Sequence, residues 1–122
     1  MSYVFDDQSG SEVWVPSLGV GKFFIAMTEY LADSIGLPSG LEKLAEDWYK
    51  FDPRAYVEFV DKVIKKTWDH SVFRELERGY VAILIVLLGK IGVTAEAEDY
   101  AGRLDLESPI SLDALRRAMP PH

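Results

Sequence analysis

The residues best suited to acid–base chemistry lie in one stretch, TWDHSVFRELERG at positions 67–79. His70 is the only histidine before the last residue, and an imidazole with an ordinary pKa of about 6.5 transfers protons near neutral pH. Ser71 follows it directly, but adjacency in the sequence does not create the geometry that a nucleophile and its base require. The same residues could begin a helix, with Asp69 or Ser71 as its N-cap. His70 is therefore a candidate catalytic residue without an evident partner.

Two pairs of acidic residues, Glu29 with Asp33 and Glu42 with Glu46, stand four positions apart. On a helix such neighbours approach closely enough for one carboxyl to hold its proton more tightly, as general acid catalysis requires. Like-charged pairs are equally typical of solvated helix faces, because a raised pKa needs burial. Glu29 is the second catalytic candidate, since it borders the aromatic stripe that begins at Phe23.

Several other chemistries are excluded by what the sequence lacks. Without cysteine there are no disulfides, thiolate metal sites or cysteine nucleophiles. The stretch GVGK at 19–22 is not a phosphate loop, because its spacing is wrong and Phe23 stands where a magnesium-binding hydroxyl belongs. Two histidines are too few for a histidine-rich metal site, and no calcium-loop pattern is present. We therefore expect neither a metal nor a cofactor.

The charge balance bears on the partners that the protein could have. Its 13 basic and 20 acidic residues give a formal net charge of -7, which repels nucleic acid phosphates. A basic protein partner would be attracted instead, although such a charge also keeps ordinary proteins in solution. The longest strongly apolar run, 80–88, is shorter than the roughly 18 residues that span a bilayer, and residues 1–14 do not resemble a secretory signal. We expect a cytoplasmic protein that binds neither nucleic acid nor membrane.

The elements that would position these residues begin with a short β-hairpin at about 3–15. YVF and EVWV favour strands, and the Asp, Gly and Ser residues between them favour a turn. After Pro16 the apolar residues recur every three or four positions, which predicts an amphipathic helix that ends before Gly36 and Pro38. Next, Ser39 and Glu42 have the spacing of a capping box, so a short second helix is expected to bury residues of 41–48. These are Leu41, Leu44, Ala45 and Trp48.

Two longer helices follow. Asp52 and Pro53 suit the N-cap and the first position of a helix that runs to about Trp68 and buries one apolar stripe. Another helix is predicted at about 71–90, before Gly92. Its first half is one-sided, and its second half is apolar all round, which is typical of a helix surrounded by others. The residues expected to turn inward in the first half are Val72, Phe73, Leu76 and Tyr80.

Residues 94–122 form an acidic C-terminal segment. Its apolar residues favour a docked irregular segment or a short helix over a free tail. A short terminal helix is expected after Ser111 as N-cap, ending at Pro120. The whole chain, 1–122, is predicted to form one domain. Its class is mainly α, a helical bundle around the central apolar helix at about 71–90 with the N-terminal hairpin beside it.

Four stretches carry a resemblance to a known family. The start MSYVFD, then GLPSGL, DPRAYVEFV and HSVFREL, make residues 1 to about 92 similar to a family of short uncharacterised proteins from actinobacteria. The resemblance implies a bacterial cytoplasmic setting. It implies no activity and no catalytic residue.

These observations favour a small acidic interaction or accessory protein, of the immunity type, over an enzyme. It would bind a protein partner, a basic one if charge steers the encounter, and homodimerisation is compatible with this. The alternative is a small enzyme or ligand-binding helical protein with an aromatic-lined pocket, although aromatic residues at helical spacing are more often core. The residues that such a pocket would use are Phe24, Tyr30, Trp48, Tyr49, Tyr56 and Trp68.

Overall fold

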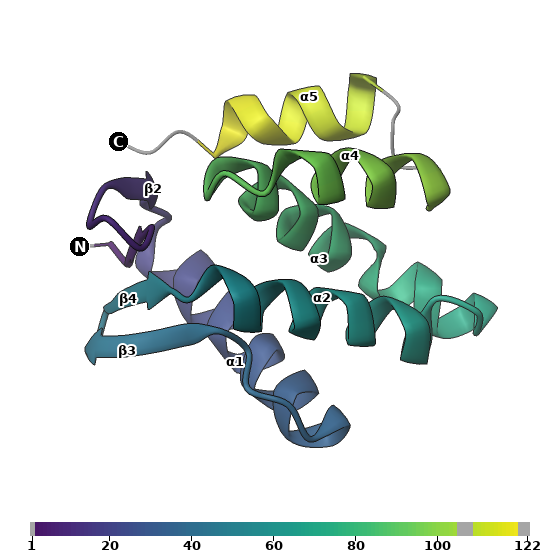
Figure 1. Cartoon of the computed structure of the whole chain (residues 1–122), viewed down its shortest axis with the longest axis horizontal. Coiled ribbons are helices and arrows are strands. Elements are labelled where there is room, and N and C mark those ends of the chain that lie inside the picture. The colour runs from purple at the N-terminus through teal and green to yellow at the C-terminus, as the bar shows by residue number, and fades with distance from the viewer. Residues whose placement is uncertain (1, 105–108, 120–122) are drawn as a thin grey trace.

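The computed structural model describes residues 2–104 and 109–119, apart from the side chains of residues 109–111. Within these residues the chain forms five helices and a four-stranded sheet (Figure 1). In chain order the elements are β1 (Val4–Asp6), β2 (Glu12–Trp14), α1 (Leu18–Ile35), β3 (Leu41–Ala45), β4 (Trp48–Phe51), α2 (Pro53–Thr67), α3 (Ser71–Lys90), α4 (Thr94–Arg103) and α5 (Pro109–Ala118). The predicted mainly helical class is confirmed.

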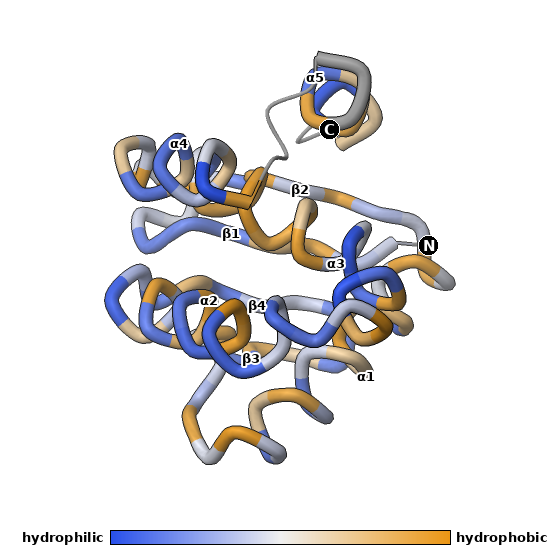
Figure 2. Tube along the Cα trace, turned by 90° about the vertical axis from the view of Figure 1, so that its right-hand side faces the viewer, coloured by the Kyte–Doolittle hydropathy of each residue, from blue (hydrophilic) through white to orange (hydrophobic). Residues whose placement is uncertain are grey.

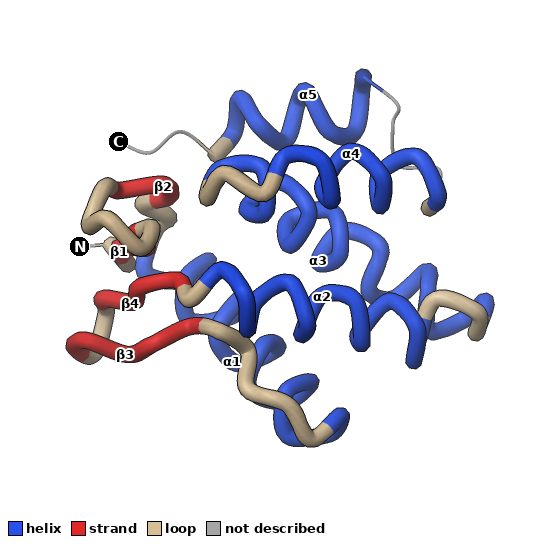
Figure 3. The backbone as a smooth tube through the Cα atoms, viewed as in Figure 1, coloured by secondary structure: helices blue, strands red, loops and turns tan. Residues whose placement is uncertain are grey.

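The N-terminal hairpin is part of a larger mixed sheet, with strand order β2-β1-β4-β3. β1 pairs with β2 antiparallel, as predicted, and with β4 in parallel, where Phe5 lies opposite Tyr49. The strands gather at one end of the molecule, beside the start of α2 (Figure 3). Phe5 and Trp14 pack edge-on against Phe24 of α1, with ring centroids 5.6 Å and 5.3 Å apart. The hairpin therefore packs aromatic residues of both its strands on a helix.

The prediction of a short helix at 41–48 is wrong, because this segment forms β3 and the start of β4. The apolar spacing of Leu41, Leu44, Ala45 and Trp48 suggested a helix, yet β4 alternates instead, with Tyr49 and Phe51 buried. The strand conformation is favoured because β4 pairs with the edge of β1, which lies more than 40 residues earlier in the sequence. Ser39 caps no helix; its hydroxyl accepts a hydrogen bond from the Leu41 amide.

Helices α1 and α2 begin and end for local reasons. α1 ends at Gly36, whose φ of 74° is the left-handed conformation expected there. α2 starts as predicted, with Pro53 at its first turn and the Asp52 carboxylate accepting from the amide of Ala55 at 3.5 Å. The hydroxyl of Ser17, which the sequence pattern did not single out, accepts from the Val20 amide at the start of α1.

The predicted central helix is α3. In its second half Val81, Leu84, Ile85, Leu87 and Leu88 are almost completely buried. The hydrophobic stretches of the chain concentrate around it (Figure 2). None of the described helices reaches the length and hydrophobicity that a crossing of the bilayer demands.

The C-terminal helices cover one side of α3 (Figure 1). Residues 94–103, for which the sequence left an irregular segment or a helix open, form α4, which buries Tyr100. α5 begins at Pro109, so Ser111 lies inside the helix and the prediction that it is the N-cap is wrong. The physical reason is that proline suits the first turn of a helix, where its missing N–H is not needed. The expected stop at Pro120 lies outside the described residues.

Candidate functional site

Helix α1 carries a row of apolar side chains that the fold leaves uncovered. Val20, Phe23, Met27 and Tyr30 follow one another at spacings of three, four and three residues. Phe23 and Tyr30 are 67% and 69% exposed, and Met27 is half-buried. The core-facing side of the helix includes Phe24 instead. Contiguous exposed apolar surface of this kind is typical of binding sites rather than of ordinary protein surface.

The first half of α3 shows the same feature. Val72 and Leu76 are 74% and 80% exposed, and Phe73 is also exposed. The prediction that these three side chains turn inward is wrong for a physical reason: the first half of α3 extends beyond the helices that surround its second half (Figure 1). Phe73, Leu76, Tyr80 and Ile83 repeat the spacing of three, four and three residues found on α1.

The two rows form the walls of a hollow that we call the α1–α3 groove. It consists of two adjoining cavities that share Met27. The first has a volume of about 290 Å³ and the second about 240 Å³. The first cavity is lined by Ala26, Met27, Tyr30, Leu31, Phe73, Leu76 and Glu77. The second is lined by Val20, Phe23, Phe24, Met27, Tyr80 and Ile83.

Contacts between α1 and α3 hold the floor of the groove in place. The hydroxyls of Thr28 and Tyr80 lie 2.7 Å apart in a buried hydrogen bond, and the rings of Phe24 and Tyr80 lie 5.7 Å apart. Burial raises the pKa of Tyr80 well above its usual range, so its hydroxyl keeps its proton. The two walls are thus fixed to each other below a surface that stays open.

Glu77 is the one charged side chain among the described residues that line the first cavity. Its side chain is 3% exposed, and its Oε1 accepts a hydrogen bond from the hydroxyl of Thr67. The same hydroxyl lies 2.7 Å from the carbonyl oxygen of Val63. Because a hydroxyl has one proton to donate, these two oxygens compete for it. Oε2 has no hydrogen-bond partner among the described residues. Burial raises the pKa of Glu77, and the bond from Thr67 offsets part of that rise.

The two candidate catalytic residues lie outside both cavities of the groove. His70 is exposed at the N-cap position of α3, where its side chain makes no capping hydrogen bond. Neither Asp69 nor Ser71 occupies that position, so the capping predicted for them is wrong; Ser71 is the first helical residue. Glu29 is exposed on α1, and its negative charge adds to the burial that raises the pKa of Tyr49.

The aromatic residues predicted to form a pocket lie in separate places. Phe24 and Tyr30 belong to the α1–α3 groove, one in each cavity. The Trp48 indole donates to Asp6 Oδ2 at 2.7 Å, and the hydroxyl of Tyr56 donates to the carbonyl of Leu84 at 2.8 Å. Tyr49 stacks in the sheet, and Trp68 lies under two arginine side chains. Phe24 and Tyr30 are thus the two predicted residues that share a feature.

Glu77 is the site residue that sequence reasoning missed. It stands four residues after Phe73 and three before Tyr80, so it falls on the apolar side of α3. A single acidic residue within such a row was the available signal. What the sequence could not give is that the opposite wall comes from α1, more than 40 residues away.

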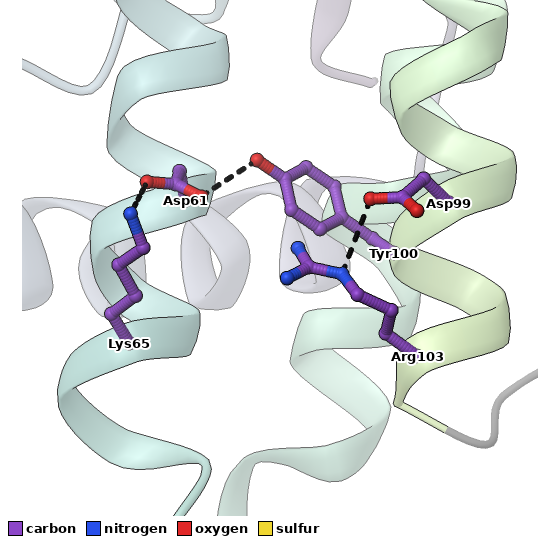
Figure 4. Close-up of polar contacts among 5 residues, drawn as sticks. All are labelled: Asp61, Lys65, Asp99, Tyr100 and Arg103. Carbon is purple, nitrogen blue, oxygen red and sulfur yellow. Dashed lines mark hydrogen bonds and ion pairs between the residues drawn. The ribbon is translucent and has the colours of Figure 1, made fainter.

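A polar cluster on another side of the molecule joins α2 to α4 (Figure 4). Asp61 accepts from the Tyr100 hydroxyl at 2.9 Å and pairs with Lys65 at 2.8 Å. Lys65 and Tyr100 lower the pKa of Asp61, whereas burial and Asp61 raise that of Tyr100 to about 12. Arg103 pairs with Asp99 and lies over the Tyr100 ring. Each member is engaged within the chain, so the cluster is a structural connection that holds α4 on α2.

No group of three or more metal-ligating side chains occurs in the part of the chain that the structure describes. Fold and groove define a small, mainly helical protein with a mixed sheet and an open apolar groove. The chain belongs to the Family of unknown function (DUF6086), whose model matches residues 1–121. The predicted membership of an uncharacterised family is thereby confirmed, and the match extends well past residue 92. Neither the curated proteins nor the solved structures gave a match.

Proposed function

We propose that this protein is a non-enzymatic interaction protein that binds an amphipathic helix of a protein partner in the α1–α3 groove. The observation that supports it most is the pair of apolar rows with matching spacing, one on each wall, of which Val20, Phe23, Tyr30, Phe73 and Leu76 are exposed. Amphipathic helices dock into apolar grooves through side chains at positions i, i+3 or i+4, and i+7. The rows present the complementary pattern.

The dimensions of the groove suit one helix of about three turns. Val20 and Tyr30 are separated by ten positions on α1, which is about 15 Å at about 1.5 Å per residue. The row on α3 from Phe73 to Ile83 has the same length. A helix lying between the two would insert its side chains between those of both walls, as packed helices do.

Binding would remove the exposed rows from water. Full burial of a side chain the size of Leu or Phe contributes about 1.5–3 kcal/mol. Association itself costs on the order of 4–15 kcal/mol in lost freedom. Burial of the exposed side chains, Phe23, Tyr30 and Leu76 among them, together with the apolar residues of the partner helix, would offset that cost, and we expect a reversible complex.

A strand added to the sheet is the other common way to bind a peptide, and the sheet edges favour it less. β2 and β3 are the outer strands. β2 is three residues long, and β3 exposes Glu42 and Lys43, which are charges of the kind that discourage strand addition. The groove offers a larger apolar surface than either edge.

The acidic character of the chain indicates the charge that we expect of the partner. A net charge of -7 favours encounter with a basic partner, and association steered by charge weakens as salt rises. It also disfavours pairing with a second copy of the same chain. A bacterial cytoplasm is the setting in which we expect this complex.

A charge placed in the groove tests the proposal. The probe is a display library of 18-residue peptides, selected on the full chain, in which half of the members have apolar residues at spacings of three and four and half have the same residues scrambled. Leu76→Glu should weaken the selected peptides at least about tenfold, because it puts a carboxylate in the interface. Leu44→Glu is the matched control, since Leu44 is also an exposed leucine but lies on β3.

The outcomes separate the alternatives. Circular dichroism should show that both variants fold like the parent chain. Enrichment of the spaced peptides, lost in Leu76→Glu and kept in Leu44→Glu, supports the proposal. Equal enrichment of scrambled peptides contradicts it. A dimer that sediments as such in the parent chain and dissociates in Leu76→Glu would assign the groove to a second copy and overturn the proposed partner.

A further inference from the structure

We infer that Glu77 binds a cationic side chain, the ammonium group of lysine or the guanidinium group of arginine, carried by the helix that occupies the α1–α3 groove. The inference rests on the proposed function, since it assigns the chemistry of the partner at that site. Its basis is a buried carboxylate oxygen without a partner among the described residues, carried by a residue that lines an otherwise apolar cavity.

The carboxyl group of Glu77 is only half satisfied. The Thr67 hydroxyl serves Oε1, while Oε2 is buried with no donor among the described residues. A buried acceptor without a donor costs on the order of 1–3 kcal/mol, and more when it is charged, so such a group is uncommon without a reason. A ligand that supplies the missing donor would recover that free energy.

The cavity around Glu77 indicates what kind of group that donor belongs to. Its other lining residues are apolar, apart from the hydroxyl group of Tyr30. Its volume of about 290 Å³ is at the lower end for small-molecule sites. Lysine and arginine place apolar stems along apolar surface and a cation at the tip. One such side chain would lay its stem against Met27, Phe73 and Leu76 and bring its tip to Glu77.

The position of Glu77 fits the end of a docked helix. Glu77 lines the first cavity, whereas the second cavity, on the other side of Met27, is lined by apolar side chains and Tyr80. A bound helix would therefore place apolar residues along the second cavity and its cation in the first. Charge complementarity selects this occupant over a second acidic copy of the chain.

Protonation of Glu77 should then be coupled to binding. Burial raises the pKa of this carboxyl and a cation favours its ionised form, so affinity should rise as pH rises through that pKa. Among the described residues, the titratable groups that the structure places against Glu77 are Tyr30 of α1, which lines the same cavity, and Tyr80 of α3, and the hydroxyl of Thr67 comes from α2. Arg74 and Arg78 stand three residues before Glu77 and one after it on α3, where both lie over the Trp68 ring. Arginine does not titrate in this range, and the buried Tyr80 keeps its proton.

A double-mutant cycle tests the assignment on the full chain. The probes are 18-residue helical peptides with leucines at spacings of three, four and three residues and one lysine at the first, middle or last turn. A matched set carries norleucine, which keeps the stem and removes the ammonium group. Each is titrated by fluorescence anisotropy against the parent chain, Glu77→Gln and the control Glu75→Gln, which changes an exposed acid on the same helix.

For the best lysine peptide, Glu77→Gln should weaken binding about 10-fold or more, and Glu75→Gln less than about 3-fold. The norleucine peptide should bind both variants alike.

The affinity of the lysine peptide should rise with pH in the parent chain and not in Glu77→Gln. The same rise in His70→Gln would show that the imidazole at the start of α3 is not the cause. If norleucine and lysine peptides respond alike to Glu77→Gln, the contact between Glu77 and a cation is overturned, while helix binding in the α1–α3 groove still stands. If no peptide binds, the proposed function fails with it.

Discussion

The two halves of α3 carry apolar side chains at the same helical spacing, but the first half leaves several of them exposed, whereas the second half is largely covered. Leu84 and Leu87 are fully buried, whereas Val72 and Leu76 are 74% and 80% exposed. Residues of α4 and α5 line hollows beside Ile83, Ile85 and Val86, and no described residue of either helix lines the cavities beside the first half. A hydrophobic pattern thus shows which side chains gain free energy from burial. The arrangement of the other helices decides whether those side chains are buried within the monomer.

The largest expected effect is a difference between the same substitution in the two halves. Leu84→Ala should lower the free energy of unfolding by about 2–5 kcal/mol, because it leaves a cavity in the packed core. Leu76→Ala should change it by less than about 0.5 kcal/mol, because the side chain is already in water. Urea unfolding of both variants measures the contrast. A loss of more than about 2 kcal/mol in Leu76→Ala would show that the first half is covered after all.

An intermediate effect is expected at Glu77, where the uncovered half meets the core. Its pKa is raised above its ordinary value of 4.5, so folding favours the protonated form. The stability from this group is therefore fully present below that value and is lost as pH rises through the folded pKa. Glu77→Gln should gain on the order of 1 kcal/mol over the parent chain at neutral pH and little at pH about 4.

Urea unfolding across this pH range measures the Glu77 effect. Glu75→Gln is the control, because it removes an exposed carboxyl from the same helix and should leave the pH dependence unchanged. A Glu77→Gln variant that loses stability at neutral pH would mean that the ionised carboxylate is well satisfied. It would thereby remove the reason for an external cation.

The smallest effect concerns α4, one of the helices that cover the second half of α3. Tyr100→Phe removes the hydrogen bond to Asp61 that connects α4 to α2, which should cost about 0.5–1.5 kcal/mol. Asp61 has a lowered pKa, so its contribution to stability is present above the ordinary value of 3.8 and is lost as pH falls through the folded pKa. The difference between parent and variant should shrink accordingly in acid. Hydrogen exchange should show faster opening in α4, while the first half of α3 stays unchanged; equal acceleration in both would contradict the separation.

Features that depend on neighbouring residues were predictable from the sequence. The start of α2 at Asp52 and Pro53 and the end of α1 at Gly36 follow from capping and backbone conformation. The central helix followed from a run that is apolar all round. By contrast, residues 41–48 have helical spacing and form strands, because a long-range pairing with β1 outweighs a weak local preference.

The candidate site was predictable only in part. Phe24 and Tyr30 were predicted as pocket residues, and the structure puts both on the α1 wall of the groove. Glu77 was overlooked, because a single glutamate in a charged stretch looks solvated until its surroundings are known. His70 drew attention by its chemistry, yet it is an exposed residue at the start of α3.

By itself, the sequence determined the acidic charge, the absence of cysteine chemistry, the long helices and most of their ends. These depend on composition and on dihedral and capping preferences that act within about four residues. Only the tertiary structure decided that residues 41–51 complete a sheet, that the rows on α1 and α3 face each other uncovered, and that Glu77 is buried between them. Each of these depends on contacts between segments far apart in the chain, which no local pattern encodes.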